Sequence, residues 1–105
     1  MISELNETQF KTKLQEEPLV AAFFHTPFCG TCKLARNMLE TVISKMNVTF
    51  PIVSCDLNRM PDLAEPFKIM SVPILVFFKN GEPVERFVAF GELEKLFYLL
   101  TKFSE

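Results

Sequence analysis

Hydrophobic residues follow two different spacings along this chain. Residues 19–24 are apolar at every position, which is typical of a strand covered by helices on both faces, and they predict the central strand of a sheet. Further along, apolar residues recur every three or four positions, which predicts a helix that runs to about residue 46 and turns one face to the core. The residues of this stripe are Ala35, Met38, Leu39, Val42, Ile43 and Met46.

Capping and stop signals predict a helix ahead of the central strand. Asn6 is followed three positions later by Gln9, which is a capping-box pattern, and the expected helix covers residues 7–16. Pro18 ends this helix, because proline has no N–H to donate and clashes with a continuing helical turn. A short edge strand is expected over residues 1–5.

A hairpin is predicted near the C-terminal end of the chain. Asn80 and Gly81 both tolerate a positive φ, so they predict a tight antiparallel connection between strands over residues 74–79 and 83–88. The remaining expected elements are an extended segment over residues 48–55, a short helix over 61–68 that Pro66 distorts, and a last helix over 92–103. The residues expected on the inner face of the last helix are Leu93, Leu96, Phe97 and Leu100.

The expected element order is β-α-β-α-β-α-β-β-α. Parallel strands joined by helices need right-handed crossovers, so this order predicts an α/β fold with a central mixed sheet of four to five strands and helices on both faces. A chain of 105 residues is long enough for one hydrophobic core, and a single domain is expected over residues 1–105.

The loop that leaves the predicted central strand carries the sequence Phe28-Cys29-Gly30-Thr31-Cys32-Lys33. Two cysteines at this spacing at the start of a helix lie one turn apart, close enough to form a disulfide. Cys29 would fall at the first helical turn, where unpaired N–H groups and the helix dipole favour a thiolate, and Cys32 would be more shielded. This asymmetry suggests an attacking and a resolving sulfur, which thiol–disulfide exchange requires.

Two other uses of the cysteines are open at the level of sequence. Zinc needs four ligands, and a Cys3His set would have to use His25, Cys29, Cys32 and Cys55, which are the only histidine and cysteines in the chain. A purely structural disulfide would stabilise the fold little, because closing so short a loop removes little chain entropy. We therefore expect no metal and no cofactor other than a redox-active Cys29–Cys32 disulfide.

Composition limits the classes of partner and compartment. A net charge of −2 leaves no basic face for nucleic acid. No apolar run approaches the roughly 20 residues that span a bilayer, and no basic leader precedes an apolar stretch, so we expect neither a membrane segment nor a signal peptide. Three cysteines are too few for a secreted disulfide framework. A cytoplasmic monomer is expected.

Three sequence features together resemble the thioredoxin family over nearly the whole chain. The redox loop is similar to the family's aromatic-Cys-Gly-Pro-Cys-Lys sequence. Val72-Pro73 begins forty positions after Cys32, where the family has its cis-proline loop, and residues 78–81 are similar to the family's hairpin between the last two strands. The resemblance implies the thioredoxin fold, with Pro73 in the cis form beside the cysteines.

The resemblance also implies a thiol–disulfide oxidoreductase that reduces protein disulfides. Cys29 would attack the substrate disulfide and Cys32 would then release the product, while Lys33 adds positive potential near the thiolate. The residues expected to shape the substrate groove are Phe28, Gly30, Val72 and Pro73, with Val72 pairing through its backbone with an extended substrate segment. The expected electron donor is a thioredoxin-reductase-like protein or a low-molecular-weight thiol.

Several positions depart from the family's pattern. Phe23 and Ser54 stand where the family has a buried acidic residue and its partner lysine. Thr31 replaces the proline between the cysteines, which leaves the first turn softer and adds a hydroxyl within reach of a sulfur. Ile74 and Ala89 replace a threonine and a glycine that line the groove, so the choice of substrate is open.

The sequence leaves more than one interpretation open for His25 and for Cys55. His25 replaces a tryptophan next to the site, where it could shuttle a proton, stabilise the Cys29 thiolate, or simply pack. Cys55 is expected to be a buried small hydrophobic residue, with a regulatory thiol as the alternative. For the whole chain, the alternatives are a specialised redox partner of one protein or low-molecular-weight thiol, a metal-handling protein, and an interaction scaffold.

Overall fold

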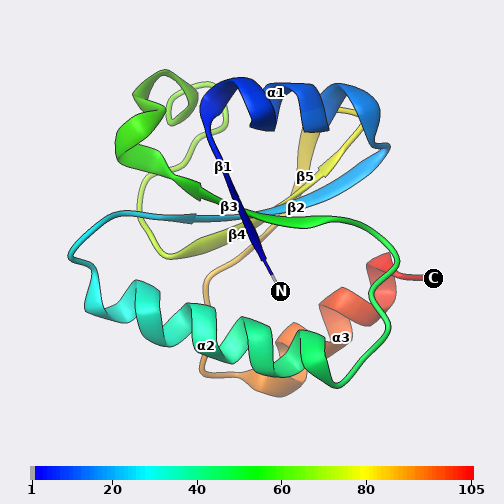
Figure 1. The fold of residues 1–105 in the computed structure, drawn as a ribbon. Helices are drawn as coiled ribbons and strands as arrows, with labels where there is room; N and C mark the ends of the chain where they lie inside the picture. The colour runs from blue at the N-terminus through cyan, green and yellow to red at the C-terminus, as the bar shows by residue number, and fades with distance from the viewer. Residues whose placement is uncertain (1) are drawn as a thin grey trace.

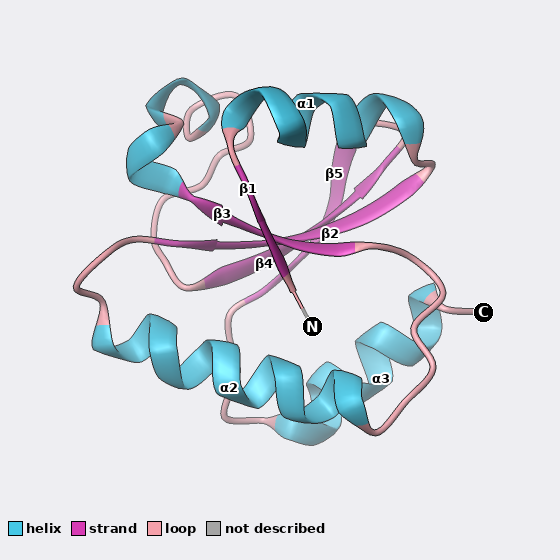
Figure 2. Cartoon of the chain, in the orientation of Figure 1, coloured by secondary structure: helices cyan, strands magenta, loops and turns pink. Residues whose placement is uncertain are grey.

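A five-stranded mixed sheet with helices on both faces forms the centre of the protein, as the computed structural model of residues 2–105 shows (Figure 1). The strands are β1 (Ser3–Leu5), β2 (Leu19–His25), β3 (Ile52–Asp56), β4 (Ile74–Lys79) and β5 (Glu82–Phe87). The helices are α1 (Glu7–Glu16), α2 (Gly30–Ser44) and α3 (Leu93–Phe103), with two short 3-10 turns, η1 (Leu57–Arg59) and η2 (Pro61–Leu63). Figure 2 separates these elements by colour.

The strand order is β1-β3-β2-β4-β5, which places β2 in the middle of the sheet. The strands β1, β3 and β2 run parallel, whereas β4 and β5 are antiparallel to their neighbours. The predicted α/β fold with a mixed sheet is therefore confirmed, and so is the central position of the strand over residues 19–24. The predicted edge strand is β1, and Met1 lies outside the described residues.

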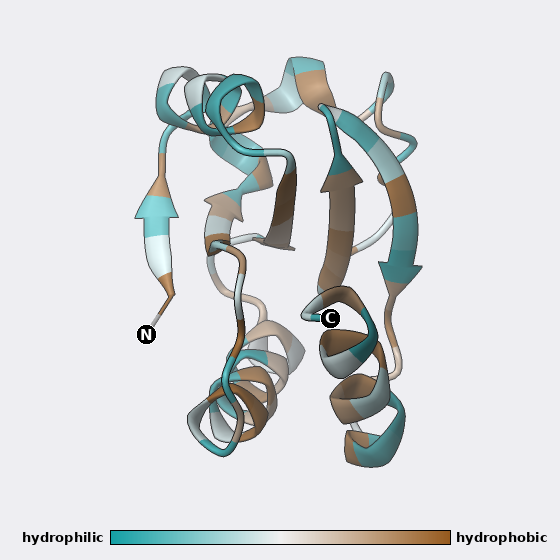
Figure 3. Cartoon of the chain, turned by 90° about the vertical axis from the view of Figure 1, so that its right-hand side faces the viewer, coloured by the Kyte–Doolittle hydropathy of each residue, from teal (hydrophilic) through white to brown (hydrophobic). Residues whose placement is uncertain are grey.

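Two apolar layers enclose the sheet. Phe23 of β2 faces the layer that contains α2 and α3, whereas Phe24 faces the layer under α1, and each side chain is at most 1% exposed. The most hydrophobic stretches of ribbon lie in the central strands, between the two layers of helices (Figure 3). Both faces of β2 are therefore buried, as its continuous apolar sequence predicts.

The start of α1 and the hairpin form as their sequences predict. The Asn6 side chain accepts a hydrogen bond from the Gln9 N–H at 2.8 Å, and the Gln9 side chain accepts one from the Asn6 N–H at 2.9 Å. These two bonds are the predicted capping box. Asn80 and Gly81 have φ values of 53° and 83°, and β4 and β5 pair on either side of them.

Two predicted elements are corrected by the structure. The helix expected over residues 61–68 is instead a series of turns that includes η2, and η1 precedes it. Pro61 and Pro66 remove backbone donors from this segment, so a continuous helical ladder cannot form. The extended segment over residues 48–55 becomes regular strand only from Ile52, just after Pro51.

The inner face of α3 also differs from the prediction. Leu96 and Leu100 are buried, but Leu93 and Phe97 are 42% and 48% exposed. Each helical residue is rotated by about 100° about the helix axis from the one before it. With Leu96 and Leu100 facing the sheet, Phe97 therefore points away from it. Within residues 2–105, no helix combines the length and apolarity needed to cross a membrane.

Replacing the capping residue of α1 tests the origin of that helix. Asn6→Ala removes the acceptor for the Gln9 N–H, and we expect the free energy of unfolding to fall by about 1 kcal/mol in urea denaturation. Asn37→Ala, the same change at an exposed position inside α2, is the control, with an expected change within about 0.5 kcal/mol. Equal losses in both variants would contradict the capping role.

Candidate functional site

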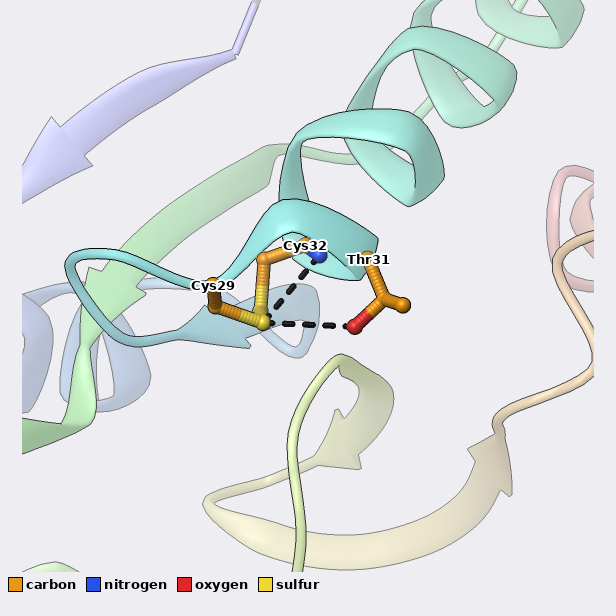
Figure 4. Close-up of a disulfide and its surroundings, with 3 residues drawn as sticks. All are labelled: Cys29, Thr31 and Cys32. Carbon is orange, nitrogen blue, oxygen red and sulfur yellow. Dashed lines mark hydrogen bonds between the residues drawn. A yellow bond between two sulfur atoms is a disulfide. The ribbon is translucent and has the colours of Figure 1, made fainter.

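Cys29 and Cys32 form a disulfide where the loop after β2 enters α2 (Figure 4). Their Cα atoms are 5.2 Å apart. Cys32 is buried at 4% exposure, whereas Cys29 is only half-buried. This difference in access matches the predicted division between an outer attacking sulfur and an inner resolving sulfur, although the two roles themselves stay predictions.

The Cys29 sulfur caps the N-terminus of α2. It accepts a hydrogen bond from the Cys32 N–H at 3.2 Å, and the Thr31 hydroxyl lies 3.4 Å from it (Figure 4). In the reduced protein the same backbone N–H, the hydroxyl and the positive end of the helix would all stabilise a negative charge on this sulfur.

The remaining residues of the redox loop are open to solvent. Phe28 has a positive φ of 62° and its side chain is fully exposed, so the aromatic ring is free to contact a partner. Gly30, Thr31 and Lys33 are exposed as well. The positive charge of Lys33 therefore lies one residue beyond the buried sulfur and on the surface.

Three loops meet at this end of the sheet. Phe24 pairs with Ile74, so the cis Val72-Pro73 bond lies at the same end as the loop that carries the cysteines. The cis form that the family resemblance implies is therefore present. Phe87 pairs with Leu75, which places the loop that begins with Val88 and Ala89 at this end too. The predicted groove residues thus come from loops that the sheet register brings together.

His25 lies at the end of β2, beside a carboxylate that the sequence did not indicate. Its Nε2 atom is 3.1 Å and 3.0 Å from the two carboxylate oxygens of Glu4 in β1. Its ring stacks on Phe23, with 5.9 Å between the ring centroids. His25 also lines a cavity of about 230 Å³, together with both cysteines of the disulfide and Arg36.

Arg36 of α2 connects this cluster to the sheet. Its guanidinium donates to the Ser54 hydroxyl and to the Ile2 carbonyl oxygen, both at 3.1 Å, and lies 3.7 Å from a Glu4 carboxylate oxygen. Glu4, Ser54 and Phe23 are successive register partners across β1, β3 and β2. A basic residue, Arg36, therefore lines the cavity beside the cysteines, and an acidic residue, Glu4, contacts Arg36 and His25; neither is at the position of the family's pair.

Glu4 cannot be found by counting positions along the chain from the cysteines. The contact between Glu4 and His25 spans 21 residues and depends on how a three-residue edge strand pairs with β3. Such a short strand carries no sequence signal for its register. The position of Glu4 was therefore decided by strand pairing.

Cys55 lies on the opposite face of the sheet from α2, in the apolar layer under α1, and is fully buried. Burial raises the pKa of its thiol to about 12, and the negative charge of Glu4 is a second, smaller cause. The expectation that Cys55 is a buried hydrophobic residue is confirmed. Residues 2–105 contain no group of three or more potential metal ligands, so the structure does not assemble the Cys3His alternative.

A cysteine pair that caps a helix directly after the central strand of this mixed sheet defines a thiol–disulfide oxidoreductase of the thioredoxin fold. A family model described as Thioredoxin matches residues 1–102. The chain belongs to the thioredoxin family, which confirms the resemblance seen in the sequence.

Relatives match most of the chain. A thioredoxin-like protein, YusE, of Bacillus subtilis is 37% identical over 89 residues, which are 85% of this chain and 83% of the relative. The thioredoxin of Staphylococcus epidermidis is 31% identical over 101 residues, which are 96% of each chain.

Solved structures agree on the fold. Oxidised thioredoxin from Plasmodium falciparum has a TM-score of 0.83 at 22% identity and covers 100% of both chains. A thioredoxin from Malassezia sympodialis also has a TM-score of 0.83, at 25% identity, with 100% of this chain and 92% of that chain covered.

Selective alkylation tests the difference between the three thiols. In the reduced, folded protein at pH 8, we expect iodoacetamide to label Cys29 first, Cys32 more slowly and Cys55 not at all, because burial keeps Cys55 protonated and out of reach. Mass analysis of the peptides measures each site. Labelling in guanidinium chloride, where all three should react, is the control, and rapid labelling of Cys55 in the folded protein would contradict this expectation.

Replacing Thr31 tests the contribution of its hydroxyl to the Cys29 thiolate. Thr31→Val keeps the shape of the side chain but removes a donor worth roughly 1 kcal/mol, so alkylation of Cys29 at pH 7 should slow by about fivefold. Thr31→Ser keeps the hydroxyl and should react within about twofold of the unchanged protein. Equal rates for all three proteins would show that the backbone cap alone stabilises the sulfur.

Proposed function

We propose that this oxidoreductase reduces disulfide bonds in protein substrates. The observation that supports this proposal most is the pairing of an accessible, helix-capping Cys29 with a buried Cys32 one turn behind it. An extended substrate can reach the outer sulfur, while the inner sulfur is protected from competing thiols. The activity needs no cofactor beyond the Cys29–Cys32 disulfide itself.

The proposed reaction has two exchange steps. The Cys29 thiolate attacks one sulfur of the substrate disulfide, and the other substrate sulfur leaves as a thiolate. The Cys32 thiolate then attacks the Cys29 sulfur, which forms the Cys29–Cys32 bond and releases the second substrate sulfur. Two electrons pass from the cysteine pair to the substrate, and each released thiolate takes up a proton.

Exposed apolar side chains around the cysteines support a protein substrate. Phe28 is fully exposed, Met70 in the loop before Pro73 is 95% exposed, and Val88 after β5 is 61% exposed. Apolar side chains left in water at one end of a domain are typical of a surface that binds another chain. The Val72 backbone, next to the cis bond, would pair with the substrate segment as the family resemblance implies.

The proposal extends to partners and location. A thioredoxin-reductase-like protein or a low-molecular-weight thiol would return the disulfide to the dithiol, because the pair cannot act again until it is reduced. We propose a cytoplasmic location, because reducing conditions there maintain the dithiol. We also propose that the protein is a monomer. Neither nucleic acid nor a membrane is a proposed partner, since the net charge is −2.

A specialised redox partner is the second candidate, because the residues near the groove are altered. Ile74 is 6% exposed where the family has a threonine, and Ala89 adds a methyl group where the family has a glycine. Equilibration of the pair in graded dithiothreitol buffers distinguishes the candidates. A reduction potential near −270 mV would support a general reductase, and one well above it would favour a dedicated partner.

Cysteine variants test the proposed roles directly. We expect Cys29→Ser to abolish the protein's acceleration of insulin reduction by dithiothreitol, because no attacking sulfur remains. We expect Cys32→Ser to accumulate a covalent mixed disulfide with insulin that non-reducing electrophoresis detects. Cys55→Ala, which removes the third sulfur from the opposite apolar layer, is the matched control and should retain activity. A mixed disulfide formed by Cys29→Ser instead would reverse the two roles.

A further inference from the structure

The second exchange step needs a group that takes the proton of the buried Cys32 thiol. Cys32 is 4% exposed, so its proton does not pass freely to bulk water. No carboxylate projects from β2 beneath it, because Phe23 occupies that place and stacks on His25. Ser54, in the neighbouring strand, accepts a hydrogen bond from Arg36 and is not a base at neutral pH.

The cavity beside the disulfide contains one suitable base. Its titratable lining residues other than the cysteines are His25, Lys33 and Arg36. Arginine stays charged at any working pH, and a solvent-exposed lysine is protonated near neutrality. Histidine exchanges a proton between pH 5 and 8, so His25 is the lining residue with the right chemistry.

Glu4 holds the imidazole in the tautomer that can accept the proton. Because His25 Nε2 lies 3.0–3.1 Å from both Glu4 carboxylate oxygens, this nitrogen carries the hydrogen in the neutral ring. The lone pair of Nδ1 is then available as an acceptor. When Nδ1 takes a proton, Nε2 keeps its hydrogen and its contact with the Glu4 carboxylate.

Arg36 in turn restrains Glu4. It lies 3.7 Å from a Glu4 oxygen and is anchored by hydrogen bonds to Ser54 and to the Ile2 carbonyl. Two acidic residues of neighbouring strands lie next to His25: Glu4 of β1, which contacts it, and Asp56 of β3, which is its register partner. From α2, Lys33 and Arg36 line the same cavity as His25, and Glu40 lies beside Arg36. Asp56 uses its carboxylate to cap η1 through the Asn58 N–H, so it does not replace Glu4.

We propose that His25 accepts the Cys32 proton through water in this cavity, with Glu4 and Arg36 as positioning residues. The cavity of about 230 Å³ exceeds the ~30 Å³ that a water molecule occupies in the liquid, and its lining offers polar partners. The Cys32 proton passes to His25 Nδ1, and the resulting thiolate attacks the Cys29 sulfur. The Cys29–Cys32 bond forms, the bond from Cys29 to the substrate breaks, and the leaving thiolate regains a proton from the imidazolium or from solvent.

A chromogenic disulfide allows the attack of Cys32 on Cys29 to be measured without any protein substrate. The proposed proton transfer from Cys32 to His25, called the relay below, is therefore tested separately from the proposed reductase function. The reduced protein is mixed with one equivalent of 5,5′-dithiobis(2-nitrobenzoate). Attack by Cys29 releases the first coloured thiolate at a rate that depends on concentration. Attack by Cys32 on the resulting mixed disulfide releases the second coloured thiolate, and the rate of this intramolecular step does not depend on concentration. Stopped-flow absorbance records both steps from pH 5.5 to 9.5.

We expect His25→Gln to slow the second release by about 100-fold or more between pH 6 and 7.5, the scale of general-base catalysis. The two pH profiles should draw together as the pH rises, because hydroxide increasingly removes the Cys32 proton without help from a side-chain base. Glu4→Gln should give a smaller loss over the same pH range. Glu40→Gln, which removes a carboxylate 3.7 Å from Arg36 that makes no contact with His25, is the matched control and should stay within about twofold.

A loss of the same factor at every pH would mean that His25 only supports the structure, and it would overturn the relay. An unchanged rate of the second release in His25→Gln would also overturn the relay. Equal losses in Glu40→Gln and Glu4→Gln would assign the effect to the charge of Arg36 and would overturn the positioning role of Glu4. Circular dichroism establishes that each variant is folded. Should His25→Gln not fold, Glu4→Gln, in the half-exposed edge strand, carries the same test.

Discussion

The burial of β2 on both faces is the constraint on which the rest of the structure depends. Its side chains alternate between the two apolar layers. Five consecutive residues of the strand have exposed fractions of 1% or less: Val20, Ala21, Ala22, Phe23 and Phe24. A strand without a solvent face needs helices above and below it and strands on both edges, because its backbone groups and its side chains must all be satisfied internally. This burial fixes the loop after β2 at the C-terminal end of the central strand, where α2 begins.

The chemistry of the site follows from that junction. Cys29 is at once the last residue before α2 and the cap of its first turn, so the sulfur that reacts also completes the helix. Cys32 follows one turn later and is carried under the surface by the same helix. One local geometry therefore provides an accessible, electrostatically favoured sulfur and a protected one, and thiol–disulfide exchange needs both.

The charges near the site lie where water can reach them. A carboxylate at the position of Phe23 would be buried in the core, and an uncompensated buried charge costs several kcal/mol. Glu4 lies two strands away, at the sheet edge, with 47% of its side chain exposed, and Arg36 reaches back across Ser54 to meet it. The edge strand thus supplies an acidic group to His25 and Arg36, which line the cavity beside the cysteines, while Phe23 keeps its own position in the core apolar.

The sequence by itself determined the features that have local causes. The Asn6–Gln9 capping box, the Asn80-Gly81 hairpin, the continuous apolar run of β2 and the spacing of Cys29 and Cys32 each depend on residues a few positions apart. The tertiary structure alone decided the rotation of α3, which exposes Phe97, and the contact of His25 with Glu4. Both depend on how elements distant in the chain pack and pair, and local propensity carries no information about such contacts.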